Sequence, residues 1–170
     1  MKNRFTLVEL LVVIVIIVIL AGIGLPVLGK VRASAKVSQT RADVVALTTA
    51  LKQVESTYSS LRGLRNSGYF DANGKISNYN ALLEELINPQ GVSSPQFNTR
   101  KIKMLDNKNK VDSGNWGWID PWGNEYIIYI DHDGDEKVTV NSKTIYKSIV
   151  VLSKGEDKTE NTDDDVMLDQ

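Results

Sequence analysis

The chain has 170 residues, with 20 Lys and Arg against 21 Asp and Glu, and it contains no cysteine. The length allows one domain plus an appendage, and the lack of cysteine excludes disulfide bonds, thiol catalysis and cysteine-ligated zinc. Cationic side chains dominate residues 1–52 and carboxylates dominate residues 153–170, which predicts a membrane-flanking start and a candidate cation site near the end.

The first predicted element is an apolar helix. No charged residue occurs from Leu10 to Gly29, and about twenty helical residues rise roughly 30 Å, the thickness of a bilayer core. Because the stretch is apolar on every face, it does not fit a surface helix. Three interpretations remain open: a cleaved secretory signal with a small-residue site at Ala33-Ser34-Ala35, a plain membrane anchor, or a segment that also assembles subunits.

Two residues favour the assembly interpretation. Glu9 lies at the head of the apolar run, where a carboxylate is costly without a cationic partner, and the run supplies no Lys or Arg. An α-amino group created by cleavage before Phe5 would provide that partner, whereas a Glu9 at the membrane interface would reach water. Pro26 removes a helical hydrogen bond, so it predicts either a kink or the end of the span.

Residues 5–14 read Phe-Thr-Leu-Val-Glu-Leu-Leu-Val-Val-Ile and resemble the prepilin-type signal of type IV pilins and type II secretion pseudopilins. The resemblance implies a leader at residues 1–4, cleavage between Arg4 and Phe5 by a prepilin peptidase, and N-methylation of Phe5. It also implies that Glu9 pairs with the amino terminus of a neighbouring subunit, and that Pro26 takes the place of the family's helix-breaking proline. One position departs from the pattern: the family usually has Gly or Ala where this chain has Arg4.

The pattern changes after residue 29, and residues 30–62 predict an amphipathic continuation of the same helix. Six apolar residues step by three and four positions: Val44, Leu47, Leu51, Val54, Tyr58 and Leu61. This spacing places them on one helical face. We therefore expect one long helix over residues 5–61, weakened near Pro26 and ended by Gly63, whose second half packs on a domain.

Residues 63–170 predict that small globular domain. Residues 81–87 predict a short amphipathic helix, which Asn88-Pro89 would stop. Residues 88–115 are polar and predict an irregular connector. Strands are expected at residues 126–130, 137–140 and 145–152. Short turns between these strands indicate an antiparallel meander packed on the helix, so the predicted fold class is α+β.

The turn Asp-Pro-Trp-Gly-Asn at residues 120–124 lies among three tryptophans, Trp116, Trp118 and Trp122. Such aromatic clusters fill small cores more often than they bind sugars. The segment 120–129 resembles a segment of the major pseudopilin of type II secretion. Together with the prepilin-type signal, this second resemblance implies a pilin-like fold with a membrane-spanning half-helix at residues 5–29.

Two acidic clusters are candidate cation sites, because grouped carboxylates repel one another unless a cation joins them and calcium prefers oxygen ligands. The resemblance to major pseudopilins implies one calcium ion in the carboxyl-terminal loop. The matching positions are the carboxylates of Asp157, Asp163 and Asp165, with the backbone carbonyls of Leu152 and Ser153, and Asp164 can replace either neighbour.

The second cluster, Asp131, Asp133 and Asp135, is a weaker metal candidate. It is not an EF-hand loop, because the glycine is misplaced and no closing Glu follows. Asp133-Gly134 favours a hairpin turn instead. His132, the only histidine, is expected to be solvated within this loop.

We expect a structural protein rather than an enzyme. A hydrolase is disfavoured, because the sequence contains no HExxH or GxSxG motif and only one histidine. The resemblance implies a subunit of a type II secretion pseudopilus that forms a homo-oligomeric helical filament. Its partners would be prepilin peptidase, an inner-membrane assembly platform and minor pseudopilins, with no nucleic acid. It would lie in the inner membrane as a single-pass protein, with its carboxyl-terminal domain in the periplasm or outside. The alternatives are a type IV pilin and a membrane-anchored, calcium-dependent binding module.

Overall fold

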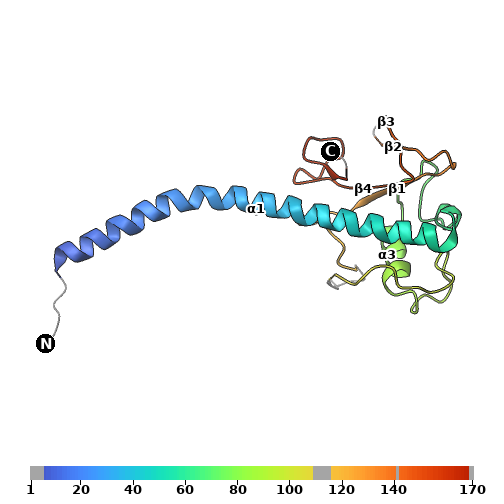
Figure 1. Ribbon diagram of the computed structural model, residues 1–170, viewed down its shortest axis with the longest axis horizontal. Helices are drawn as coiled ribbons and strands as arrows, with labels where there is room; N and C mark the ends of the chain where they lie inside the picture. Colours follow the sequence, from blue (N-terminus) through green and yellow to red (C-terminus); the bar gives the residue numbers. More distant parts are fainter. Residues whose placement is uncertain (1–5, 109–115, 141, 169–170) are drawn as a thin grey trace. The chain divides into compact units, whose positions relative to one another are not determined.

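The computed structural model describes residues 6–108, 116–140 and 142–168, except for the side chains of Ala21 and residues 23–28. The fold is α+β, with one long helix and small antiparallel sheets, and the chain divides into two compact units, residues 1–38 and 39–170 (Figure 1). The elements are α1 Leu7–Tyr58, α2 Arg62–Arg65, α3 Tyr79–Ile87, β1 Ile127–Ile130, β2 Val138–Val140, β3 Lys143–Ile145, β4 Ile149–Ser153 and β5 Val166–Met167.

The predicted long helix is present as α1, whose 52 residues include position 26. The side chain of Pro26, where a weak point was expected, lies outside the described residues. Within the part of the chain that the structure describes, no helix combines the length and the apolarity required to cross a membrane.

The apolar stripe on the second half of α1 forms one wall of the core, as predicted. Val44, Leu47 and Leu51 are fully buried, and Val54 and Leu61 are nearly so. They belong to the main core cluster together with α3, Trp118 and the inner side chains of β1 and β4. Of the three tryptophans, Trp118 is buried and Trp116 packs against the cluster at its edge, which supports the core-filling interpretation.

The helix ends earlier than the sequence predicts. Its last residue is Tyr58, and Ser59 follows with a φ of 56°, a left-handed conformation that stops an α-helix. Gly63 was the expected terminator, but it lies inside the short helix α2. The stripe is nevertheless complete, because Leu61 packs in the core from the turn between the two helices.

The strands do not form a meander. β1 pairs along its length with β4, and β4 pairs with β5 through Leu152–Met167 and Ser153–Val166, while β2 and β3 form a separate hairpin. The predicted strand over residues 145–152 is therefore two strands in different sheets, separated by residues 146–148. The turn at Asp133-Gly134 does not close a hairpin, because the strands on either side of it belong to different sheets.

The irregular connector after α3 is held in place by one buried carboxylate. Glu85 is 1% exposed, and its two oxygens accept hydrogen bonds from the N–H groups of Gln96, Phe97 and Asn98 at 2.6, 3.2 and 2.9 Å. The hydroxyl of Tyr69 donates a further bond at 2.6 Å. Among the described residues this carboxylate is compensated by hydrogen bonds, which is how a buried carboxylate is retained without an ion pair.

Candidate functional site

The amino-terminal end of α1 is closed by a capping box. Thr6 donates its N–H and its hydroxyl to Glu9 Oε2, at 2.8 and 2.7 Å, and the N–H of Glu9 donates to Thr6 Oγ1 at 3.3 Å. This reciprocal pair satisfies donors that the helix cannot satisfy itself. The predicted assembly residue therefore has a partner within its own chain, whereas Arg4 and Phe5 lie outside the described residues.

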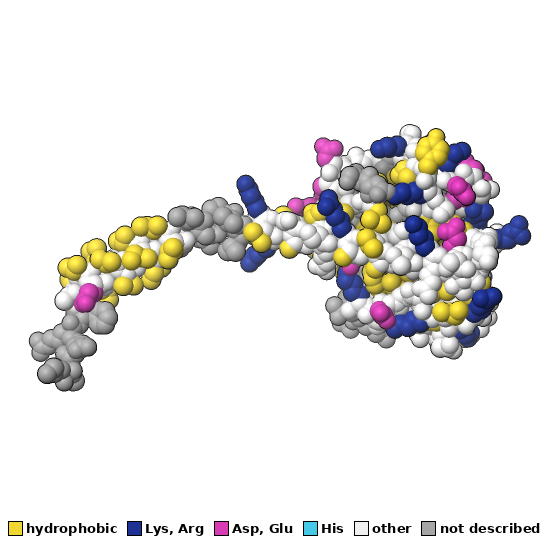
Figure 2. Space-filling model, in the orientation of Figure 1, with side chains coloured by type: hydrophobic (Ala, Val, Ile, Leu, Met, Phe, Trp, Pro, Cys, Tyr) yellow, Lys and Arg dark blue, Asp and Glu magenta, His cyan; other side chains and the backbone are white. Residues whose placement is uncertain are grey.

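Beyond this cap the helix presents apolar side chains on all of its faces. Leu7, Val8 and residues 10–20 are each between 47% and 80% exposed, and Figure 2 shows hydrophobic side chains along this stretch. An exposed helix of this composition needs a partner surface or an apolar solvent to cover it.

In the carboxyl-terminal acidic loop, residues 154–165, Asp165 is the distinctive residue. Its side chain is 5% exposed; Oδ2 accepts a hydrogen bond from the N–H of Asn161 at 2.8 Å, whereas Oδ1 is buried with no partner among the described residues. Burial raises the pKa of Asp165, and the nearby charges of Asp164 and Asp157 raise it further. A buried carboxylate oxygen that receives no hydrogen bond is the kind of atom that can coordinate a cation.

In the neighbouring Asp164, both carboxylate oxygens have hydrogen-bond donors. Asp164 Oδ2 accepts hydrogen bonds from the N–H groups of Glu156 and Asp157, at 2.7 and 3.1 Å, and Oδ1 accepts one from the Thr162 hydroxyl at 2.7 Å. The Thr162 bond is the largest cause that lowers the pKa of Asp164, followed by the bond from Asp157. Asp164 therefore holds the loop together.

The other predicted ligands are more dispersed. Asp157 and Asp163 are exposed, and Asp157 Oδ1 caps its own turn by accepting the N–H of Thr159 at 2.8 Å. Leu152 and Ser153 lie buried in β4, where they pair with β5. The loop thus supplies one buried free oxygen and two solvated carboxylates near it in sequence.

The second acidic cluster is more compact, and two of its three carboxylates are paired with cationic side chains. Among the described residues, only Asp131, Asp133 and Asp135 offer three ligand atoms within 4.8 Å of one another. Asp131 is buried and accepts hydrogen bonds from Gly134 N–H at 2.7 Å, Arg65 at 2.9 Å and Glu136 N–H at 3.1 Å. Burial acts to raise the pKa of Asp131, but these partners outweigh it, and the pKa lies below its usual value.

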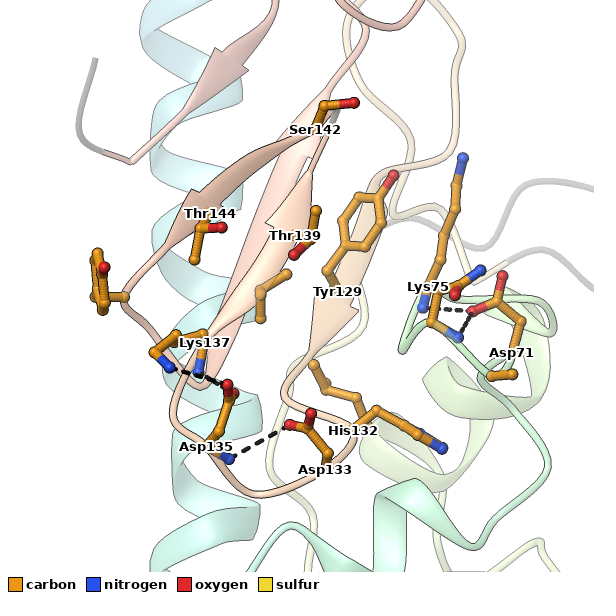
Figure 3. Close-up of a pocket in the computed structure, with 15 residues that line it drawn as sticks. Asp71, Lys75, Tyr129, His132, Asp133, Asp135, Lys137, Thr139, Ser142 and Thr144 are labelled. Atoms are coloured by element: carbon orange, nitrogen blue, oxygen red, sulfur yellow. Dashed lines mark hydrogen bonds and ion pairs between the residues drawn. The ribbon is translucent and has the colours of Figure 1, made fainter.

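Figure 3 shows the surroundings of this cluster. Asp133 and Asp135 lie in the loop after β1, beside a cleft of about 820 Å³, and the Lys137 ammonium bonds Asp135 at 3.1 Å. His132 is exposed and lines the same cleft. Arg65 and Lys137 offset two of the three negative charges here. We therefore take the acidic loop, which contains the unpartnered Asp165 oxygen, as the better cation candidate.

Sequence reasoning did not single out Thr6 or Asn124. Thr6 was detectable, because Thr-x-x-Glu is the sequence signature of a capping box. Asn124 belongs to the turn after Ile119, but its side chain bonds the carbonyl of Gly155, 31 residues later, at 3.1 Å. No local pattern reports a contact of that separation.

Comparison of the chain with protein-family models, with curated proteins and with solved structures gives no match.

Proposed function

We propose that this protein is a pilin-like filament subunit of the type II secretion pseudopilus class. The observation that carries the proposal is the exposed apolar stretch of α1 headed by a single carboxylate. The subunit would be stored in the inner membrane, processed by prepilin peptidase, and extracted by an assembly platform into a homo-oligomeric filament with minor pseudopilins. Its role is structural.

The exposed apolar residues of α1 support this proposal by their number and distribution. Every described side chain at positions 10–20 is a Leu, Val or Ile that is at least 47% exposed. A core-facing helix would hide one stripe and expose polar residues on the rest. Lipid in the stored subunit and identical helices in the filament would each cover all faces.

Glu9 would provide the directional contact in that bundle. In the single chain its Oε2 atom accepts both bonds from Thr6, which leaves acceptor capacity on the carboxylate, since an ionised carboxylate has about four lone-pair sites. A neighbour's α-amino group at Phe5 can use that capacity without breaking the cap. The charge-assisted bond would be strong where water is excluded.

The acidic loop would hold calcium through Asp165, with Asp157 and Asp163 and the carbonyls of Leu152 and Ser153 as the further predicted ligands. The orphaned Oδ1 atom of Asp165 is the observation that fits such a group. Bound calcium supplies positive charge that offsets the buried carboxylate and neighbouring acids. A folded loop would then present a fixed surface to adjacent subunits.

The test compares Glu9→Ala with Thr6→Ala in cells that assemble the filament. Each change removes the bond between the Thr6 hydroxyl and the Glu9 carboxylate, and so breaks the reciprocal capping box, but only the first removes the carboxylate. We expect both proteins to reach the membrane, Thr6→Ala to form filaments, and Glu9→Ala to form none in sheared-fibre and cross-linking assays. Normal filaments from Glu9→Ala would contradict the pairing, and equal loss in both variants would assign the defect to the cap.

Mass spectrometry of the mature amino terminus provides an independent check. A chain that begins with methylated Phe5 would support processing as a prepilin. A mature protein that begins after Ala35 would show secretory cleavage and would exclude a filament built through α1.

A further inference from the structure

A closed ring of hydrogen bonds joins the turn at residues 120–124 to the start of the acidic loop. Asp120 is 3% exposed, and its Oδ2 accepts bonds from the Ser153 hydroxyl at 2.7 Å and from the Asn124 side-chain amide at 3.0 Å. The same amide donates to the Gly155 carbonyl at 3.1 Å, and Gly155 N–H donates to Ser153 Oγ at 3.1 Å. Both N–H groups of the Asn124 amide and the hydroxyl hydrogen of Ser153 are used in this ring.

The turn itself has a fixed geometry. Asp120 Oδ1 accepts the N–H groups of Trp122 and Asn124 at 3.0 and 2.7 Å. Its backbone bonds Gly123 and Asn124 at 3.0 and 2.9 Å, and Gly123 has a φ of 90° that a side chain would strain. Moving the buried Asp120 carboxylate would break four hydrogen bonds, so the turn is a rigid support.

Gly155 connects the turn to the acidic residues, because it is hydrogen-bonded to Asn124 and lies against Asp164. It has a φ of 66°, and a Cβ atom there would lie 2.4 Å from both the carbonyl oxygen and Oδ2 of Asp164. Asp164 packs into the space that the missing side chain leaves, where its carboxylate binds the N–H groups of Glu156 and Asp157. The position of Gly155 therefore sets the position of Asp164 and of the adjoining Asp165.

We propose that Asn124, with Asp120 and Ser153, is a positioning residue for the cation site of the acidic loop. The inference rests on the proposed calcium role and adds to it. The turn at residues 120–124 aligns the loop through Gly155, so that the free oxygen of Asp165 is fixed before a cation arrives. None of the three side chains needs to touch the ion.

The test uses the full-length protein in detergent micelles with three variants. Asn124→Ala removes the bonds to Gly155 and Asp120, and Ser153→Ala removes the hydroxyl while its carbonyl remains. Asn78→Ala is the stability control, because the Asn78 side chain caps α3 by accepting Ala81 N–H at 3.3 Å, a comparable loss elsewhere in the domain. Calcium affinity is measured by titration calorimetry, and loop order by amide hydrogen exchange without calcium.

We expect Asn124→Ala and Ser153→Ala to weaken calcium binding about fivefold to tenfold, the effect of losing one net hydrogen bond. The N–H groups of Glu156 and Asp157 should exchange about tenfold faster in both variants even without calcium, and Asn78→Ala should change neither quantity. Wild-type affinity and exchange in Asn124→Ala would overturn the positioning role. Absence of calcium binding in the unchanged protein would overturn the cation site, and hydrogen exchange would still report whether the turn orders the loop.

Discussion

At the residue scale, two adjacent aspartates in the acidic loop have opposite surroundings. Hydrogen bonds lower the pKa of Asp164, beginning with the one from Thr162, whereas burial raises the pKa of Asp165. The sequence shows only a run of three identical side chains, so it could not tell which one is buried. That difference comes from the pairing of β5 with β4 immediately after the loop, which carries Asp165 inward.

Replacing Asp165 with Asn should stabilise the calcium-free protein at neutral pH by about 1 kcal/mol, because a neutral amide replaces a charge with an unpartnered oxygen. The folded state binds a proton at Asp165 more tightly than the unfolded chain does. Between the ordinary carboxyl pKa and the raised one, wild-type stability therefore falls as pH rises. Urea unfolding of both proteins at acidic and neutral pH measures this difference, which should shrink once the wild-type carboxyl is protonated.

Calcium should reverse the order at neutral pH, stabilising the wild type and leaving Asp165→Asn nearly unchanged, since a ligand that binds only the folded state raises its stability. A variant that is less stable than wild type in the absence of calcium would contradict the assignment of an unsatisfied buried charge.

At the scale of elements, the sequence predicts structure wherever periodicity is long enough to read. The stripe on α1 and the helix α3 were predictable, because each extends over two or more turns with apolar residues on one face. The short strands β3 and β5 were not, since three and two residues carry no period. The pairing of β1 with β4 was not predictable either, because the separate β2–β3 hairpin lies between these two strands in the sequence.

Glu85 provides the test at this scale, because one side chain of α3 orders the connector that follows. Glu85→Ala leaves three backbone N–H groups without acceptors and should lower the free energy of unfolding by about 3 kcal/mol. Glu84→Ala is the matched control, since Glu84 is exposed on the same helix and should change stability by less than about 0.5 kcal/mol. Equal effects in urea titrations would show that the hydrogen bonds accepted by Glu85 contribute little to the free energy of unfolding.

At the scale of the whole molecule, α1 belongs to both compact units, and its second half is part of the domain core. A boundary at residue 62, where the sequence suggests that the globular domain begins, removes one wall of that core. Tyr126, immediately before β1, also donates its hydroxyl to Asp43 on α1 at 2.7 Å, so the helix is joined to the rest of the domain by polar as well as apolar contacts.

Two fragments distinguish these boundaries. Residues 39–170 should fold cooperatively, with a sharp thermal transition and dispersed amide signals, because they retain the buried side chains of α1 from Val44 to Val54. Residues 63–170 should remain unfolded, because several fully buried apolar side chains are missing and each is worth about 1.5–3 kcal/mol. A folded 63–170 fragment would show that the sheets and α3 form a sufficient core alone.

Among the described residues, the strand β5 pairs with the sheet through two residue pairs, Leu152–Met167 and Ser153–Val166. The loop before it is a covalent tether that keeps these few contacts at high effective concentration. A single protease cut between Asp157 and Asp163 would turn the end of the chain into a short peptide that diffuses away and takes Asp165 with it. Resistance of that loop to digestion would then determine how long the folded domain keeps Asp165.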